Sequence, residues 1–155
     1  MDDLAQDVLA KARARNIRIT TAESCTGGMI AAALTAIPGS SDVFERGFVT
    51  YSNAAKQDML GVQAATLDAH GAVSEQVAAE MAIGARANSK AQLAVSVTGI
   101  AGPGGSDHKP EGRVCFGLSQ AGQTHTETVE FGPLGRTQVR DAATNHALTL
   151  LLNAP

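Results

Sequence analysis

The chain has 155 residues, of which 44% are hydrophobic, 17% charged and only 3% aromatic, and its formal net charge is −3. This length fits one domain with one buried core, and the composition excludes an intrinsically disordered chain. The acidic balance and the lack of any run of Lys or Arg argue against a general nucleic-acid surface.

Cysteine content and the amino terminus indicate the compartment. Cys25 and Cys115 are too few for a disulfide framework and have no metal-ligand spacing. The first four residues include two aspartates, whereas a secretory signal starts basic and continues apolar. The apolar run 29–37 is far shorter than the about 20 residues that span a membrane. We therefore expect one cytoplasmic domain, residues 1–155, that does not contact membranes.

The first half of the chain alternates helical and strand patterns. Apolar residues three or four apart predict helices, and β-branched residues that alternate with polar ones predict strands. In chain order we expect a helix over 2–15, a strand over 17–22, a small-residue helix over 26–36, a strand over 43–51 and a helix from 54 to about 60. Ser52-Asn53 offers a cap for the last of these helices.

The second half continues the alternation and ends with a hairpin and a helix. We expect a helix over 64–69, a longer helix capped by Ser74, a buried strand over 93–97, strands over 114–118 and 124–131, and an amphipathic helix over 136–152. Val77, Met81 and Ile83 are expected on the inner face of the helix after Ser74. These elements predict a three-layer α/β/α sandwich around a mixed, mostly parallel sheet.

Three polar segments, 24–28, 51–56 and 98–105, each follow a predicted strand. In open α/β sheets, ligands bind beyond the carboxyl ends of the strands. If the three strands run in the same direction, the three segments share one edge of the sheet. We therefore expect the functional site at that edge.

Ser24 lies at the centre of the first of these segments. A serine at a strand-to-helix turn can cap the helix, or it can be a nucleophile or part of an anion site formed by successive N–H groups. If Ser24 is the nucleophile, capping can pass to Thr26. A nucleophilic serine needs a base. The four histidines, His70, His108, His125 and His146, have no obvious orienting carboxylate, which argues against a Ser-His-Asp triad.

Lys56 is the better candidate base. A lysine is normally protonated at neutral pH, so its pKa must be lowered by burial or by the positive end of a helix. Lys56 is expected in the first turn of a helix, where both causes can act. This interpretation depends on spacing alone, and a solvated surface lysine is the ordinary alternative.

Other polar residues near this edge also allow two interpretations. Tyr51, the only tyrosine, can contact a planar substrate or Ser24, or it can be an ordinary strand residue. Thr98 can bind an anion or simply end a strand. Arg136 and Arg140, early in the last helix, can bind a phosphate bidentately or form surface pairs.

No cofactor or metal motif is present. Residues 99–105 match neither Gly-x-Gly-x-x-Gly nor the Walker pattern, and no His-x-His, Cys-x-x-Cys or His-Glu-x-x-His pattern occurs. We therefore expect no cofactor and no metal.

Four motifs together resemble the CinA carboxy-terminal domain family. They are Thr-Ala-Glu-Ser-Cys-Thr-Gly-Gly at 21–28, Phe-Glu-Arg-Gly-Phe-Val-Thr-Tyr-Ser-Asn-x-x-Lys at 44–56, His-Gly-Ala-Val-Ser at 70–74 and Thr-Gly-Ile-Ala-Gly-Pro at 98–103. The resemblance covers nearly the whole chain. It does not extend to the molybdopterin-binding-like domain of full-length CinA proteins, so the pyrophosphatase activity of that domain is not carried over.

Characterised members of the family are nicotinamide mononucleotide deamidases, described as Ser/Lys amidohydrolases. The resemblance implies an α/β/α fold, Ser24 as the nucleophile, Lys56 as its base and Tyr51 as an assisting residue. It places Thr98 in the substrate loop and gives Arg136 or Arg140 a part in the site.

The implied reaction converts nicotinamide mononucleotide to nicotinate mononucleotide and ammonia, in pyridine nucleotide recycling. The oxyanion is expected at the backbone amides of Cys25, Thr26, Gly27 and Gly28, and the 5′-phosphate at an arginine with the amides of Thr98 and Gly99. We expect a small-molecule substrate, a homo-oligomer and no direct nucleic-acid contact. The alternative is a non-enzymatic accessory protein in DNA uptake or damage response that acts through a protein partner.

Overall fold

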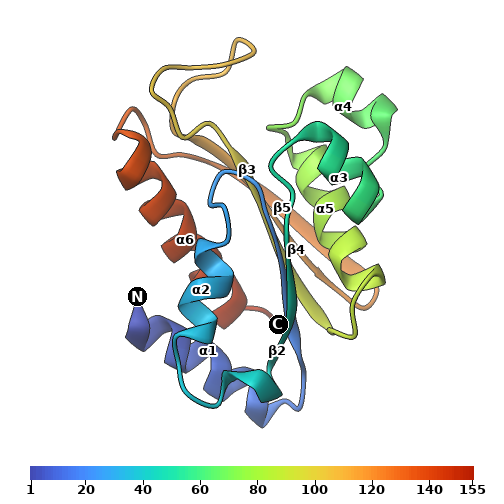
Figure 1. The fold of residues 1–155 in the computed structure, drawn as a ribbon, viewed down its shortest axis with the longest axis vertical. Coiled ribbons are helices and arrows are strands. Elements are labelled where there is room, and N and C mark those ends of the chain that lie inside the picture. The colour runs from blue at the N-terminus through green and yellow to red at the C-terminus, as the bar shows by residue number, and fades with distance from the viewer.

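The computed structural model describes residues 1–155 (Figure 1). Its elements are α1 (Asp2–Ala14), β1 (Ile19–Glu23), α2 (Met29–Thr35), a 3₁₀ turn (Ser40–Asp42), β2 (Phe44–Val49), α3 (Asn53–Leu60), α4 (Ala64–His70), α5 (Glu75–Ala87), β3 (Leu93–Gly99), β4 (Arg113–Gln120), β5 (Gln123–Glu130) and α6 (Arg136–Leu152). Every predicted helix and strand is present. The bounds of α6 match the prediction, whereas α2 begins three residues later than expected, at Met29.

The five strands form one mixed sheet in the order β2-β1-β3-β4-β5. β1 pairs in parallel with both β2 and β3, whereas β4 is antiparallel to both of its neighbours. Four strands therefore point in one direction and β4 alone points in the other. The predicted mostly parallel sheet is confirmed, and β3 lies at its centre as expected.

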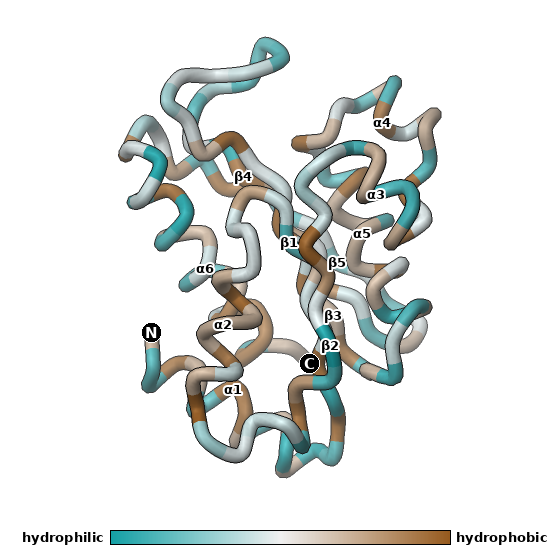
Figure 2. Tube along the Cα trace, in the orientation of Figure 1, coloured by the Kyte–Doolittle hydropathy of each residue, from teal (hydrophilic) through white to brown (hydrophobic).

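Helices cover both faces of the sheet (Figure 1). α1, α2 and α6 lie on one face, and α3, α4 and α5 lie on the other. The larger hydrophobic cluster, of 23 buried residues, packs under α1, α2 and α6, and a second cluster of 8 packs mainly under α3 and α5. Figure 2 shows hydrophobic residues along the strands and inner helix faces, in contrast to the largely hydrophilic loop between β3 and β4. The three-layer sandwich is thus confirmed.

The inner face of α5 differs from the prediction at one position. Val77 and Met81 are fully buried, but Ile83 is 48% exposed. Two residues along a helix correspond to a rotation of about 200°, which places Ile83 opposite Met81. Gly84 is on the buried side instead, where an added Cβ would lie 1.9 Å from the carbonyl oxygen of Leu60. The absence of a side chain at Gly84 therefore lets α5 approach the end of α3 closely.

The sheet topology determines where the polar segments lie. Because β1, β2 and β3 are mutually parallel, their carboxyl ends lie at the same edge. Residues 24–28, 50–56 and 99–112 leave the sheet at that edge. The predicted convergence of the polar segments is confirmed. None of the helices is both long enough and apolar enough to cross a membrane.

Candidate active site

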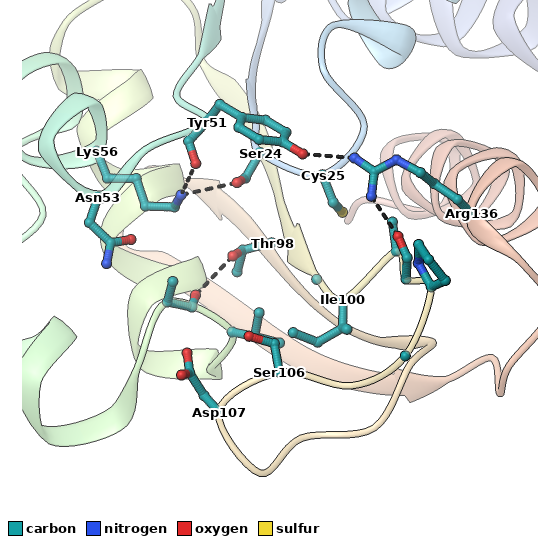
Figure 3. Close-up of a pocket in the computed structure, with 17 residues that line it drawn as sticks. Ser24, Cys25, Tyr51, Asn53, Lys56, Thr98, Ile100, Ser106, Asp107 and Arg136 are labelled. Carbon is teal, nitrogen blue, oxygen red and sulfur yellow. Dashed lines mark hydrogen bonds between the residues drawn. The ribbon is translucent and has the colours of Figure 1, made fainter.

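A pocket of about 370 Å³ opens at this edge of the sheet (Figure 3). Seven of the residues predicted for the site line it: Ser24, Cys25, Tyr51, Lys56, Thr98, Gly99 and Arg136. Four other predicted residues do not line it: Thr26, Gly27, Gly28 and Arg140. The pocket is also lined by Asn53 and Ile100, which lie in the predicted polar segments but were not chosen as site residues, and by Ser106 and Asp107, which lie outside those segments.

Ser24 and Lys56 point toward each other inside this pocket (Figure 3). The Nζ atom of Lys56 lies 3.0 Å from Oγ of Ser24, and it also donates to the carbonyl oxygens of Thr50 at 3.0 Å and Tyr51 at 3.3 Å. Ser24 is 8% exposed and Lys56 only 1%. Lys56 forms no ion pair. Burial therefore lowers the pKa of the Lys56 ammonium, as a general base requires.

The position of Lys56 follows from the start of α3. Ser52 is the N-cap, because its Oγ accepts a hydrogen bond from the backbone N–H of Ala55 at 3.0 Å. The helix thus begins at Asn53, one residue earlier than predicted, and Lys56 is its fourth residue. Side chains on a helix tilt toward its N-terminus. The Lys56 side chain therefore reaches back to the end of β2 and to Ser24.

The turn after β1 presents Ser24 and leaves two amides without an oxygen partner. The N–H of Ser24 donates to the Val97 carbonyl and the Ser24 carbonyl accepts from the N–H of Gly27, both at 3.0 Å. Gly27 and Gly28 have left-handed φ values of 59° and 106°, which residues other than glycine rarely adopt. The N–H groups of Cys25 and Thr26 donate to no carbonyl or side-chain oxygen.

Cys25 also faces the pocket, but its thiol is poorly suited to be the nucleophile. Burial raises its pKa to about 11, so the thiol is protonated at neutral pH. Its neighbour Ser24 has an amine within hydrogen-bond distance. Between the two adjacent residues, the geometry favours Ser24.

The helix cap at this turn was not predicted correctly. Glu23 is completely buried, and its carboxylate accepts hydrogen bonds from the Thr26 hydroxyl at 2.6 Å, the Ile30 N–H at 2.9 Å and the Ala31 N–H at 3.0 Å. A carboxylate at this end of a helix is stabilised by the free N–H groups and the helix dipole. Neither Ser24 nor Thr26 caps α2. The sequence feature that could have indicated this cap is Glu23 itself, an acidic residue at the end of the strand, just before the polar turn.

The two candidate arginines make different contacts. Arg136 donates from Nη2 to the Tyr51 hydroxyl at 2.8 Å and from Nη1 to the Gly102 carbonyl at 2.7 Å (Figure 3). Arg140 donates from Nε to the Cys25 carbonyl at 3.0 Å and from Nη2 to the Thr26 carbonyl at 3.4 Å. The sequence left the choice between them open. Only Arg136 lines the pocket, together with Tyr51.

The loop between β3 and β4, residues 99–112, forms the opposite wall and is held by side chains. The Thr98 hydroxyl, just before the loop, donates to the Ala72 carbonyl at 2.8 Å. Nζ of Lys109 donates to the carbonyls of His70 at 2.7 Å and Val73 at 2.5 Å. Glu111 accepts from the backbone N–H of Gly104 at 2.7 Å and of Gly135 at 3.0 Å. Sequence reasoning did not identify Lys109 or Glu111.

No histidine lines the pocket. One of them does have a carboxylate partner, contrary to expectation: His146 Nε2 lies 2.7 Å from Glu127 Oε1, and its ring packs edge-on against Phe116. This pair lies on α6 and β5, outside the pocket that contains Ser24. No group of three or more His, Cys, Asp and Glu side chains is arranged to hold a metal ion.

Comparisons with known proteins identify the family. The model of the CinA C-terminal domain matches residues 1–154. "Nicotinamide-nucleotide amidohydrolase PncC" of Escherichia coli K12 is 51% identical over 149 residues, which are 96% of this chain and 90% of that protein. A "CinA-like protein" of Mycolicibacterium paratuberculosis is 47% identical over 157 residues, 97% of this chain but 35% of that longer protein.

Solved structures show the same relationship. The "competence/damage inducible protein CihA" from Agrobacterium tumefaciens superposes with a TM-score of 0.94 at 49% identity and covers 98% of this chain and 94% of its own. The "competence damage-inducible protein A (ComA)" from Klebsiella pneumoniae superposes with a TM-score of 0.95 at 41% identity. The match covers 99% of this chain and 95% of that chain. The chain therefore belongs to the CinA C-terminal domain family.

Proposed function

We propose that this protein is an amidohydrolase that converts nicotinamide mononucleotide to nicotinate mononucleotide and ammonia. The observation that carries the proposal is the 3.0 Å contact between Ser24 Oγ and the buried Nζ of Lys56. A hydroxyl beside a buried amine is the arrangement of an activated nucleophile. The name of the Escherichia coli relative supplies the substrate class.

The hydrogen bonds of Lys56 support its part in proton transfer. In a neutral amine, two N–H groups donate to the carbonyls of Thr50 and Tyr51, and the lone pair faces the Ser24 hydroxyl. Lys56 takes the Ser24 proton as Oγ attacks the amide carbon, and the two carbonyls then stabilise the ammonium. Lys56 returns the proton to the leaving nitrogen, which departs as ammonia. Lys56 then takes a proton from a water molecule as its oxygen attacks the acyl carbon, and returns that proton to Oγ of Ser24 as the ester bond breaks and nicotinate mononucleotide is released.

Backbone amides of the turn stabilise the tetrahedral intermediate in this mechanism. The N–H groups of Cys25 and Thr26 are available, whereas the N–H of Gly27 donates to the Ser24 carbonyl. Gly27 and Gly28 act by allowing the turn to form. Of the four residues expected at the oxyanion, we therefore assign the role of donor to Cys25, which lines the pocket, whereas Thr26 is fully buried outside it.

Arg136 and Tyr51 hold the rest of the substrate. Arg136 is an exposed cation at the rim of the pocket, and its guanidinium can pair with a phosphate. Its bond to the Tyr51 hydroxyl orients the aromatic ring along the same wall. Thr98 and Gly99 line the wall at the end of β3, where the Thr98 hydroxyl donates to the Ala72 carbonyl.

The test is ammonia release from nicotinamide mononucleotide by the wild type, Ser24→Ala and Lys56→Ala. We expect turnover by the wild type and loss in both variants. Lys90→Ala is the matched control, because Lys90 is exposed and lies outside the pocket. Full activity in either Ser24→Ala or Lys56→Ala would refute the assignment.

Two further parts of the proposal are a homo-oligomeric assembly, which rests on the family resemblance, and a cytoplasmic location, which rests on the low cysteine content. Sedimentation velocity of the purified chain tests the first, and a carboxy-terminal fluorescent fusion tests the second. The names of two solved relatives refer to competence and damage induction. No contact in the site favours a role without catalysis over the amidohydrolase.

A further inference from the structure

We propose that Arg140 is a positioning residue: it holds the peptide groups after the nucleophile so that the turn keeps the N–H of Cys25 directed to the oxyanion. This inference rests on the proposed amidohydrolase function. It also changes the expected role of Arg140 from phosphate binding to control of the catalytic turn.

The contacts of Arg140 all lie behind the turn. Its guanidinium donates to the carbonyls of Cys25 and Thr26, and Arg140 does not line the pocket. The helix holds it in place, because the neighbouring Val139 and Ala143 are fully buried. Arg140 therefore lies behind the pocket, but its bond to the Cys25 carbonyl joins it to a residue that lines the pocket.

The planarity of the peptide bond transmits this contact to the site. In a trans peptide, the C=O and the N–H of one unit point in opposite directions. The Cys25 carbonyl is directed to Arg140, so the N–H of Thr26 is directed away from α6. The Ser24 carbonyl is bound to the N–H of Gly27, which fixes the N–H of Cys25 in the same manner. Both of these N–H groups have no oxygen partner within the protein.

Charge adds to this effect. Arg140 forms no ion pair with a carboxylate, and its guanidinium is bonded to backbone carbonyls instead. A cation at the carbonyl end of a peptide polarises the group and makes its N–H a stronger donor. Arg140 thus acts on the N–H of Cys25 from outside the pocket, through the hydrogen bond from the Gly27 N–H to the Ser24 carbonyl.

Gly27 is adapted to this contact. Its φ is 59°, and a Cβ added there would lie 3.2 Å from Nη2 of Arg140. A side chain at this position would press against the guanidinium and strain the turn. The glycine therefore allows Arg140 to lie against the turn.

Arg136 provides a matched comparison, since it is one helical turn away on α6 but faces the pocket. The experiment measures kcat and KM of the full chain for Arg140→Met, Arg140→Lys and Arg136→Met. Two substrates are used: nicotinamide mononucleotide and its thioamide analogue. Sulfur is a weak hydrogen-bond acceptor, so the amide depends on oriented oxyanion donors more than the thioamide does.

For Arg140→Met we expect kcat for the amide to fall by on the order of 10- to 100-fold while KM stays within about twofold. The ratio of amide to thioamide kcat falls as well, and Arg140→Lys gives intermediate values for both quantities. Arg136→Met instead raises KM. If Arg140→Met does not fold, the smaller amide-to-thioamide ratio in Arg140→Lys decides the question.

Three results would overturn the inference. They are an unchanged kcat in Arg140→Met, an equal loss for amide and thioamide, and a rise in KM like that of Arg136→Met. An equal loss for both substrates would mean a merely structural role. A wild type without turnover would instead refute the proposed function, and this inference with it, so the two failures are distinguishable.

Discussion

The two walls of the pocket are built in opposite ways. On one wall, Ser24 and Lys56 are almost fully buried and are held by backbone groups at the ends of strands. On the other wall, the loop 99–112 is largely exposed and is held by the side chains of Lys109, Glu111 and Arg136. The first wall can keep reacting atoms at a fixed distance, whereas the second can change without disturbing the sheet. We therefore expect changes in the first wall to lower kcat and changes in the second to raise KM.

The strongest test of this division is Lys56→Met, which replaces the base by an apolar side chain of similar length. We expect kcat to fall by about 10³-fold or more, because Ser24 then has no base. The protein should become more stable by about 1 kcal/mol, a rise in Tm of about 2–4 °C, because a buried amine is removed. Ammonia release and thermal melting measure the two effects. A variant within tenfold of the wild-type rate would contradict the role of Lys56.

The pH dependence of activity and of stability tests the same role of Lys56. Because burial lowers the pKa of Lys56, kcat/KM should rise about tenfold per pH unit below that pKa and level off above it. In the unfolded chain, the pKa returns to about 10.4. Between the two values the unfolded state binds more protons, so the free energy of unfolding increases with pH.

Both parts of this pH prediction can be measured. A pH–rate profile tests the first, and denaturant titrations at several pH values test the second. The stability slope should disappear in Lys56→Met. A slope that persists in that variant would mean that another group causes it.

Glu23→Gln tests how far the first wall depends on its buried cap. The carboxylate of Glu23 accepts three hydrogen bonds at the start of α2, and an amide places an NH₂ group against some of these donors. We expect a loss of about 2 kcal/mol in the free energy of unfolding. Glu130→Gln is the control, because its exposed ion pair with Arg113 contributes less than about 1 kcal/mol. Equal losses in the two variants, measured by urea denaturation, would show that Glu23 has no special role.

The smallest effect is expected for Lys109→Met in the second wall. This change removes both hydrogen bonds to the turn that contains Ala72 and Val73, two pocket-lining residues. We expect KM to rise by up to about tenfold, equal to about 1.4 kcal/mol, with kcat changed less than about twofold. Lys90→Met serves as the matched surface control. A fall in kcat with unchanged KM would contradict the expectation that changes in the second wall affect substrate binding and not catalysis.

The fold could be predicted largely from periodicity. All helices and strands were expected, and the common direction of β1, β2 and β3, on which the predicted place of the site depended, is present in the sheet. Ile83 was placed on the wrong face, because one apolar residue outside the helical period can be mistaken for part of the buried stripe. Local patterns thus predict elements well and single side chains less well.

The site could be predicted only in part, because its supporting contacts join residues that are far apart in the sequence. The rim with Ser24, Tyr51 and Lys56 was expected from three polar segments at strand ends. The roles of Arg136 and Arg140 could not be separated, since each depends on a partner more than 80 residues away. The same applies to Lys109, which contacts carbonyls more than 35 residues away. No local pattern records such contacts.

The shielding of Lys56 has a consequence for the response to ionic strength. Mobile ions screen exposed charges over a Debye length of about 8 Å at physiological salt, but they do not enter a dry contact between an amine and backbone carbonyls. Lys56 is 1% exposed, whereas Arg136 lies at the exposed rim of the same pocket. Added salt should therefore weaken the capture of an anionic substrate and leave the speed of bond cleavage unchanged. Substrate binding and bond cleavage thus respond differently to the ionic composition of the solution, although both take place in one pocket.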